Sequence, residues 1–375
     1  MKKRLIRILI IIVTGFLIGF INTLFIYDGV WGHFNKGLGS VFWWVHIIYF
    51  LVSLFLVILV HELGHLFSFL KHKVKVKALY ALMFAFVKEE KRIKIRLVPK
   101  FLLLIGGIVI PDEMVIDNKK KEDEIIEIIK KVLIAGPNTS LVYGVIIFII
   151  WLIFLFTNFY LLNGFLFTLM LTAIIMTFLV VKSSKISRGS LYGDYVASEQ
   201  ISKNELFRIN YLYQLVSLIK RDNKSIDYLW PKIVNELTKK SSYSNSLYLN
   251  LINIYLEEVT FYEKIGSTGV EDKFDKIIKR LSNHEDGLIT YYQFIYFYQS
   301  RKNYLKVTSL LNDLNHKEFK VDKKVKLFHK KLTNHLLGFS DESEFLNNKK
   351  NLYPSSLSWI YDPLKLPFEI KEIKK

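Results

Sequence analysis

The chain has 375 residues, of which 51% are hydrophobic, and its mean hydropathy is +0.25. It contains no cysteine, which excludes disulfides, thiolate metal sites and cysteine nucleophiles. The formal net charge is +18, and no nucleic-acid-binding motif accompanies it, so we attribute the charge to basic residues that flank membrane spans. Composition therefore predicts a membrane protein with a soluble part and without a nucleic-acid partner.

Four apolar segments are long enough to cross a lipid bilayer as helices, at about 20 residues each. They cover residues 5–27, 42–67, 132–157 and 159–181. The first is longer than the core of a signal peptide and lacks a small-residue cleavage site, so we interpret it as an uncleaved span. We therefore expect a polytopic bundle of about four membrane helices.

The charges between these segments indicate their orientation. Residues 28–40 carry one lysine, whereas residues 71–77, 88–100, 117–131 and 182–188 are crowded with Lys and Arg. Because basic loops stay on the cytoplasmic side, both termini are predicted to be cytoplasmic. The abundance of Lys, Ile and Asn suggests a bacterial source, hence a bacterial cell membrane.

The second segment ends in the sequence HELGH, residues 61–65. On a helix, positions i and i+4 share a face, so His61 and His65 can bind one metal ion while Glu62 accepts a proton from water. A charged residue inside a bilayer costs about 2.5–3.5 kcal/mol, which a metal site would justify. The alternative is a helix end that has reached the membrane interface, since basic residues follow at 71–73.

The region between the second and third spans predicts a small β-hairpin. Residues 91–97 alternate polar and apolar side chains, as strands do. Residues 101–111 are apolar but too short to span, and the paired Gly106 and Gly107 favour a turn or re-entrant loop. Two interpretations stay open: an interfacial hairpin packed on the bundle, or a sheet edge that pairs with an extended substrate.

Zinc in a hydrolase usually has three protein ligands, and no third histidine follows at the spacing of soluble metzincins. Asp194, just after the fourth span and next to Gly193, is the best third ligand, and its other interpretation is a helix cap or turn acid. Asp112 is weaker because it follows Pro111 in an ordinary turn signal. The remaining candidates near span ends are Glu113, Asp117, His46 and His72.

From about residue 201, apolar residues recur at helical spacing, in sets within 206–219, 247–255 and 288–298. Helices of this kind usually pack as pairs, and residues 292–314 look like one tetratricopeptide unit, although no fixed period follows. We expect a membrane domain over residues 1–200 and a cytoplasmic helical domain over residues 201–375, which offers a surface to a protein partner. Four isolated histidines of this part are expected at the surface or in packing: His284, His316, His329 and His335.

Three short sequences make this chain resemble the site-2 protease family of intramembrane zinc metalloproteases, over roughly residues 45–200. They are HELGH at 61–65, GGIV at 106–109 and AGP at 135–137, in the family's order. The HExxH sequence within a span is the specific element, and the other two support it. The family's acidic ligand follows some tens of residues later, where this chain has Asp194.

The chain departs from the family pattern in three places. A glycine precedes Asp194 instead of following it, and the family's Asn after Gly-Pro falls at Ser140, with Asn138 nearby. The usual Asn-x-x-Pro before the aspartate is replaced by the polar residues 183–188. The resemblance implies Zn2+ held by His61, His65 and Asp194, Glu62 as the catalytic residue, and substrate contacts at Gly106, Gly107, Asn138 and Ser140.

The resulting hypothesis is a zinc metalloprotease that cleaves membrane-embedded or membrane-associated peptides, with Glu62 moving a proton from water to the leaving amine. The substrate must be extended because helical carbonyls are already hydrogen-bonded, and residues 91–110 would hold it by strand pairing. The alternative is a scaffold or peptide-export accessory protein whose metal site is degenerate. A transporter has little basis because the four spans show no internal repeat.

Overall fold

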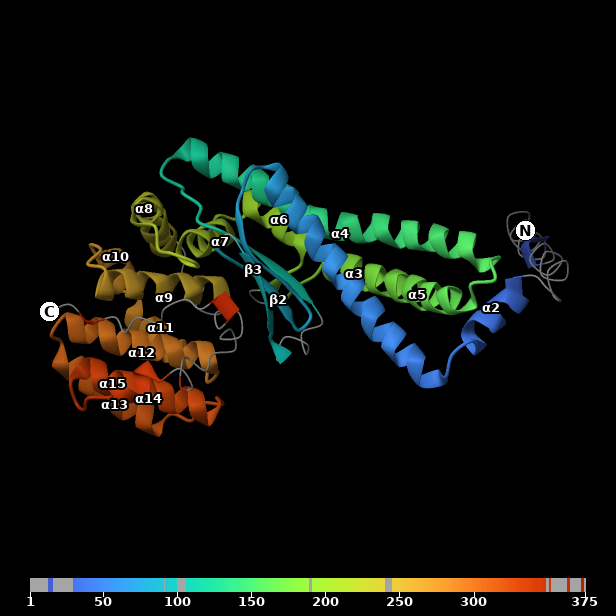
Figure 1. Cartoon of the computed structure of the whole chain (residues 1–375). Helices are drawn as coiled ribbons and strands as arrows, with labels where there is room; N and C mark the ends of the chain where they lie inside the picture. Colours follow the sequence, from blue (N-terminus) through green and yellow to red (C-terminus); the bar gives the residue numbers. More distant parts are fainter. Residues whose placement is uncertain are drawn as a thin grey trace, which may run out of the picture. The chain divides into compact units, whose positions relative to one another are not determined.

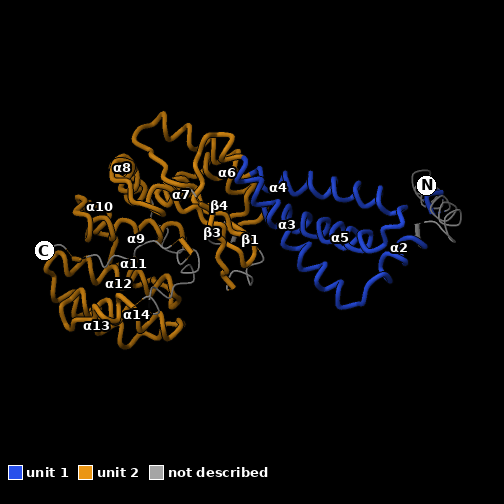
Figure 2. Tube along the Cα trace, in the orientation of Figure 1, with its two compact units in different colours: residues 1–67, 134–184 blue, residues 68–133, 185–375 orange. Residues whose placement is uncertain are grey.

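The computed structural model describes residues 13–15, 30–90, 92–99, 106–188, 191–239, 245–348, 351, 363–364 and 372–373. The chain divides into two compact units, residues 1–67 with 134–184 and residues 68–133 with 185–375 (Figure 2). The predicted first span, residues 5–27, lies outside the described residues except for 13–15, which are helical. We predicted that residues 201–375 fold on their own as a separate domain, and this boundary stays a prediction.

The first unit is built from helices (Figure 1). They are α2 (Val30–Gly39) and α5 (Tyr160–Ser183), together with the parts of α3 (Trp43–Lys71) and α4 (Lys119–Leu155) that belong to this unit. Helices α3, α4 and α5 are long and apolar enough to cross a membrane, so three of the four predicted spans are candidate membrane-spanning helices. In the described part of the chain these three are the candidate spans.

The outer surfaces of these helices are apolar. Ile47, Val145 and Phe178 are 51%, 60% and 65% exposed, while the unit's buried cluster centres on Val57 and Leu169. Leaving so much apolar area in water would cost roughly 25 cal/mol per Å2. Lipid is the solvent that removes this cost, so the chain is a membrane protein.

The second unit contains a four-stranded antiparallel sheet with the order β3-β2-β1-β4. The strands are β1 (Val76–Ala81), β2 (Phe84–Glu89), β3 (Arg92–Leu97) and β4 (Gly107–Pro111). The alternation over residues 91–97 is confirmed as β3. The expectation of a turn at the paired glycines is wrong for Gly107, which begins β4 and pairs with Ala81 of β1. The predicted hairpin is thus part of a larger sheet.

A short hairpin, β5 (Ser187–Arg188) and β6 (Leu191–Tyr192), precedes a series of helices in the second unit. These are α6 (Asp194–Lys203), α7 (Glu205–Ser217), α8 (Asn223–Lys239), α9 (Ser246–Phe261), α10 (Thr268–Glu271), α11 (Phe274–Arg280), α12 (Glu285–Ser300), α13 (Tyr304–His316), α14 (Lys323–Leu337) and α15 (Ser343–Asn347). Asparagine side chains begin three of them: Asn204, Asn245 and Asn303 accept backbone N–H groups at the starts of α7, α9 and α13.

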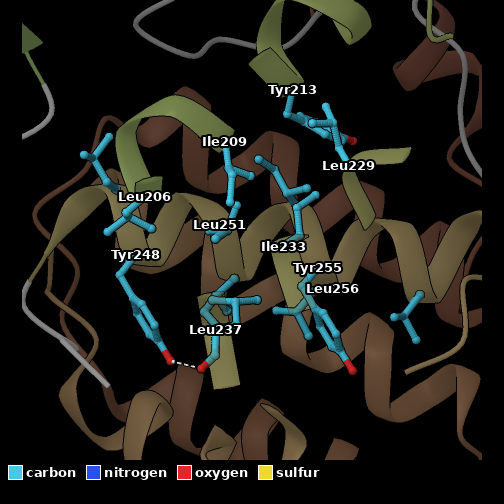
Figure 3. Packing of buried hydrophobic residues seen from close by; sticks show 14 of the residues in the cluster. Leu206, Ile209, Tyr213, Leu229, Ile233, Leu237, Tyr248, Leu251, Tyr255 and Leu256 are labelled. Atoms are coloured by element: carbon cyan, nitrogen blue, oxygen red, sulfur yellow. Dashed lines mark hydrogen bonds between the residues drawn. The ribbon is translucent and has the colours of Figure 1, made fainter. Parts of the chain in front are cut away.

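The helical periodicity after residue 201 is confirmed by burial. Leu206, Ile209, Leu251 and Tyr255 are at most 3% exposed and belong to one large core (Figure 3). The hydroxyl of Tyr248 donates to the carbonyl of Leu237 at 3.4 Å within this core (Figure 3), which fits the need of buried tyrosines for a polar partner. A tetratricopeptide arrangement stays a prediction.

Two carboxylates are buried among these helices. Glu258 on α9 is fully buried; it accepts a hydrogen bond from Tyr213 Oη at 2.8 Å and is paired with Arg221. Glu122, in the amino-terminal part of α4, is 1% exposed, accepts a hydrogen bond from Tyr228 Oη at 2.7 Å and is paired with Lys232. Such pairs cost stability when one partner is removed, because the other charge is then left buried.

His329 on α14 is the one predicted packing histidine among the four that is buried, with 5% of its surface exposed. Its ring stacks on Tyr292 with centroids 5.4 Å apart. Burial lowers the pKa of His329 to about 4, so the side chain is neutral at physiological pH.

Candidate metal centre

The histidines of the HELGH sequence face one another across a turn of α3. His61 Nε2 and His65 Nε2 are 3.2 Å apart, and the ring planes meet at 82° with centroids 4.9 Å apart. Helical spacing alone explains this proximity, because residues i and i+4 lie one above the other on the same face. The two rings thus face each other as helical spacing predicts, and their role as metal ligands stays a prediction.

The separation of the two nitrogens fits a bound metal. Two nitrogens at about 2.0–2.1 Å from a zinc ion, at a tetrahedral angle, lie about 3.3–3.4 Å apart. The Nε2 atoms of His61 and His65, at 3.2 Å, are close to this separation. The same distance also permits a hydrogen bond between the two rings, so the donor set fits zinc without requiring it.

Two glycines permit close packing between α3 and α4 beside the histidines. A Cβ atom on Gly136 of α4 would lie 2.3 Å from His65 Nε2, and one on Gly64 of α3 would lie 2.5 Å from Thr139 Oγ1. Both contacts are shorter than any real Cβ contact, so larger residues would force the helices or the histidine to move. This is the physical reason for glycine within HELGH and within AGP.

Ser140 on α4 hydrogen-bonds one of the histidines. Its Oγ lies 3.0 Å from His61 Nδ1, and the serine is 1% exposed. When Nδ1 carries the ring hydrogen, Ser140 accepts it and the Nε2 lone pair faces His65. The Ser140 carbonyl in turn accepts a hydrogen bond from Thr177 Oγ1 of α5 at 3.1 Å, so three helices meet at this point.

The sequence predicted a substrate contact at Ser140 and missed its contact with His61. A signal was present: Ser140 lies four residues after Gly136, so both occupy the face of α4 that meets the histidines. Asn138, the neighbouring candidate, is exposed. The substrate contacts predicted at Asn138 and Ser140 stay predictions.

Glu62 is 3% exposed on α3, directly after His61. An ionised carboxylate avoids such a position unless it is paired or used, because burial disfavours the charged form. A general base next to a metal is one such use. The catalytic role predicted for Glu62 stays a prediction.

Asp194 is the first residue of α6 and belongs to the second unit. The β5–β6 hairpin ends two residues earlier, and Gly193 acts as the helix N-cap, with its N–H donating to the Ile186 carbonyl at 3.0 Å. Asp194 is half-buried, and burial together with the Asp194 charge raises the pKa of Tyr211. In the described part of the chain, His61, His65 and Asp194 make up the group of side chains that could hold a metal ion.

The other candidates for a third ligand have partners of their own. His46 Nε2 lies 3.0 Å from the Leu38 carbonyl, and His72 Nδ1 lies 2.8 Å from the Ser68 carbonyl. Glu113 is 3.8 Å from Lys220, and Asp117 accepts a hydrogen bond from its neighbour Asn118. The backbone of Asp112 continues the sheet, because its N–H donates to the Lys75 carbonyl at 2.8 Å.

Gly106 and Gly107 lie in the sheet and not on the helices that carry the histidines. The Gly106 carbonyl accepts a hydrogen bond from Leu82 N–H at 3.0 Å, and Gly107 begins β4. Residues 101–105, which precede them, lie outside the described residues. The substrate contacts predicted for both glycines stay predictions.

Apolar spanning helices with two facing histidines and a buried glutamate are typical of a membrane-embedded metallopeptidase. The comparison with protein families agrees: the family model of peptidase family M50 matches residues 49–339. The chain belongs to this family, the site-2 proteases, whose members are zinc metalloproteases in general. None of the curated proteins and none of the solved structures matches the chain.

Proposed function

We propose that the chain is an intramembrane zinc metalloprotease that hydrolyses peptide bonds of membrane-embedded or membrane-associated peptides. The observation that carries the proposal is the pair of Nε2 atoms 3.2 Å apart on an apolar helix, with Glu62 buried between the two histidines in sequence. Membership of peptidase family M50 supports it.

Each residue of the proposed site has its own role. His61 and His65 would hold Zn2+ through Nε2, and Asp194 would supply the third, carboxylate ligand. When bound, zinc lowers the pKa of the attacking water and polarises the scissile carbonyl. Glu62 accepts the proton of that water and gives it to the leaving amine. Ser140 would hold His61 in the tautomer whose Nε2 lone pair is free to bind the metal.

The sheet offers a place for an extended substrate. The outer strands of the sheet are β3 and β4, and the outward edge of such a strand presents N–H and C=O groups that another strand can pair with. A peptide held in this way would be unwound, as hydrolysis requires. Gly106 and Gly107 then lie next to the substrate backbone, where the absence of a side chain allows a close approach.

The zinc content of the purified chain tests the metal site. The enzyme should retain near one zinc ion per chain, measured by inductively coupled plasma mass spectrometry, and His61→Ala should lose it. A chain that binds no zinc even when zinc is supplied in excess would instead favour the alternative, a scaffold or peptide-export accessory protein with a degenerate site. The polar residues 183–188, where the family has Asn-x-x-Pro, are the feature of this sequence that favours that alternative.

Two matched aspartate variants test the third ligand. Asp194→Ala should lower zinc content and activity together, as the loss of a direct ligand does, whereas Asp112→Ala should leave both nearly unchanged. Normal zinc content in Asp194→Ala would refute this ligand and return the search to Asp112, Glu113 and His72.

The membrane topology follows from the distribution of basic residues, with both termini in the cytoplasm of a bacterial cell. Because the chain has no cysteine, single introduced cysteines report it directly. Leu305→Cys, at a position that is 89% exposed on α13, should resist an impermeant thiol reagent added to intact cells. Asn158→Cys, in the link between α4 and α5, should react. Labelling of Leu305→Cys would show that the chain has the opposite orientation in the membrane.

The substrate is sought by trapping. A full-length Glu62→Gln protein should bind substrate without cleaving it, so that peptides co-purify with this variant and not with the active protein. Recovery of the same peptides, uncleaved, from both proteins would contradict proteolysis.

A further inference from the structure

Helix α4 contacts both histidines of the candidate metal centre. The backbone of Gly136 lies directly against the His65 ring, and Ser140 Oγ is 3.0 Å from His61 Nδ1. The amino-terminal part of α4, through residue 133, belongs to the second unit. Because an α-helix rises about 1.5 Å per residue, Lys130 lies about 9 Å along this helix from Gly136. A group attached to α4 at Lys130 is therefore held about two helical turns from the contact with His65.

Ser198 attaches α6 to α4 at this residue. Its Oγ donates a hydrogen bond to the Lys130 carbonyl at 3.1 Å, and the serine is buried, with 9% of its surface exposed. Asp194 and Ser198 are four positions apart on α6, so they lie on the same face of the helix. The face of α6 that carries Asp194 is therefore the face that contacts α4.

Helix α6 is too short to fix its own position. It has 10 residues, whereas an isolated helix needs about 12–15 to be even marginally stable in water. Besides Ser198, its buried residues are Ala197 and Ile201, which belong to the same hydrophobic core as Ile129 and Val132 of α4. Apolar burial is non-directional, whereas a hydrogen bond requires a given length and angle. The hydrogen bond from Ser198 therefore fixes the position of α6 along α4 more closely than the apolar contacts do.

The two ends of α6 are held by other elements. At the start, the Gly193 N–H donates to the Ile186 carbonyl at 3.0 Å, next to the β5–β6 hairpin. At the end, Asn204 Oδ1 accepts the Phe207 N–H of α7 at 3.2 Å. Ser198, between these ends, adds the contact with the helix that also contacts the histidines. A zinc–carboxylate bond is about 2.0–2.2 Å long, and a working site must be held within about 0.5 Å of its geometry.

We propose that Ser198 is a positioning residue of the metal centre: its hydrogen bond to the Lys130 carbonyl sets the place of Asp194 relative to His61 and His65. The inference rests on the proposed function, in which Asp194 is the third zinc ligand. Helix α4 is then the common support of all three ligands. Loss of the hydrogen bond lets α6 shift along α4, which moves the carboxylate without removing any ligand.

Zinc affinity tests this role on the purified full-length chain in detergent, by competition with a fluorescent chelator. Ser198→Ala removes one hydrogen bond, so zinc affinity should weaken about three- to tenfold. Ser198→Thr keeps the hydroxyl and should recover part of the affinity. The matched control is Glu199→Ala, at the next position of α6, where the side chain is 56% exposed and pairs with Lys203; its zinc affinity should be unchanged.

A double-mutant cycle separates positioning from a general structural role. In the Asp194→Ala background, Ser198→Ala should cause no further loss of zinc affinity, because the ligand that Ser198 positions is already gone. Damage to the fold would instead lower the affinity by the same factor in both backgrounds. The melting temperature of Ser198→Ala should stay near that of the unchanged protein, because a helical carbonyl retains its bond within the helix.

The outcomes distinguish this inference from the proposed ligand set. Unchanged zinc affinity in Ser198→Ala, together with the expected loss in Asp194→Ala, would overturn the positioning role and leave Asp194 as a ligand. An equal loss from Ser198→Ala in both backgrounds would also overturn it. Normal zinc affinity in Asp194→Ala would overturn the ligand set and the role of Ser198 together.

Discussion

Polar side chains are buried in both units, but they have different surroundings. In the second unit, the carboxylates of Glu122 and Glu258 are each held by a cation and a tyrosine hydroxyl. In the first unit, the buried Ser140 contacts His61, which contacts His65. Each of these carboxylates joins two helices through its hydrogen bonds and ion pairs, whereas the two histidines lie one turn apart on a single apolar helix. The comparison predicts that Glu122 and Glu258 serve the fold, whereas the histidine pair serves the proposed chemistry.

The largest expected effect lies in the first unit. Glu62→Gln keeps the size and burial of the side chain but removes its ability to accept a proton, so proteolysis should fall by a factor of about 100–10,000. Zinc content should stay near that of the unchanged protein, since the histidines are intact. Cleavage of a trapped substrate and metal analysis measure both quantities on one preparation. Full activity in this variant would end the assignment of Glu62 as the base.

The second unit should lose stability when a buried carboxylate is removed. Glu258→Ala leaves Arg221 and Tyr213 without their partner, so the free energy of unfolding should fall by about 3–5 kcal/mol. Chemical denaturation followed by circular dichroism measures it. Glu199→Ala is the matched control, because Glu199 is 56% exposed and paired with Lys203 on the surface of α6, where such pairs are worth about 0–1 kcal/mol. Equal losses of stability in both variants would show that burial does not make the Glu258 pair more important than the surface pair.

His329 should make the second unit sensitive to acid. Its pKa is about 4 in the folded chain and about 6.5 when unfolded, so the unfolded state binds the proton first. Stability should therefore be unaffected above pH 6.5 and should fall between pH 6.5 and 4, by up to about 3 kcal/mol. The melting temperatures of the unchanged protein and of His329→Phe at pH 7 and 4.5 measure this. The same acid-induced loss in both proteins would exclude His329 as its source.

The smallest expected effect concerns the hydrogen bond between Ser140 and His61 in the first unit. Ser140→Ala removes the hydrogen-bond partner of His61 but no metal ligand, so zinc affinity should weaken about 10- to 100-fold. Competition with a fluorescent chelator gives the affinity, and Ser140→Thr, which keeps the hydroxyl, should recover part of it. Unchanged zinc affinity in Ser140→Ala would show that the contact does not position His61.

The membrane helices and the HELGH pair were predictable because lipid leaves few choices. A long apolar run must be helical in a bilayer, and helical spacing then fixes which residues face one another. Strand β1 was not predicted, because Leu79, Tyr80 and Ala81 are buried one after another, and a continuous apolar run does not distinguish a strand from a helix. The contact between Ser140 and His61 was missed because it joins residues that are 79 positions apart. Helical spacing alone, however, places Ser140 and Gly136 on the same face of α4.

The glycine contact between α3 and α4 also restricts the routes by which molecules reach the histidines. The backbone at Gly136 lies so close to His65 Nε2 that even a methyl group would collide with the ring. No water or peptide chain fits through a contact of that closeness, so α4 closes one side of the histidine pair. Entry must therefore occur from a side that α4 leaves open, and a larger residue at position 136 would displace His65 or separate the two helices.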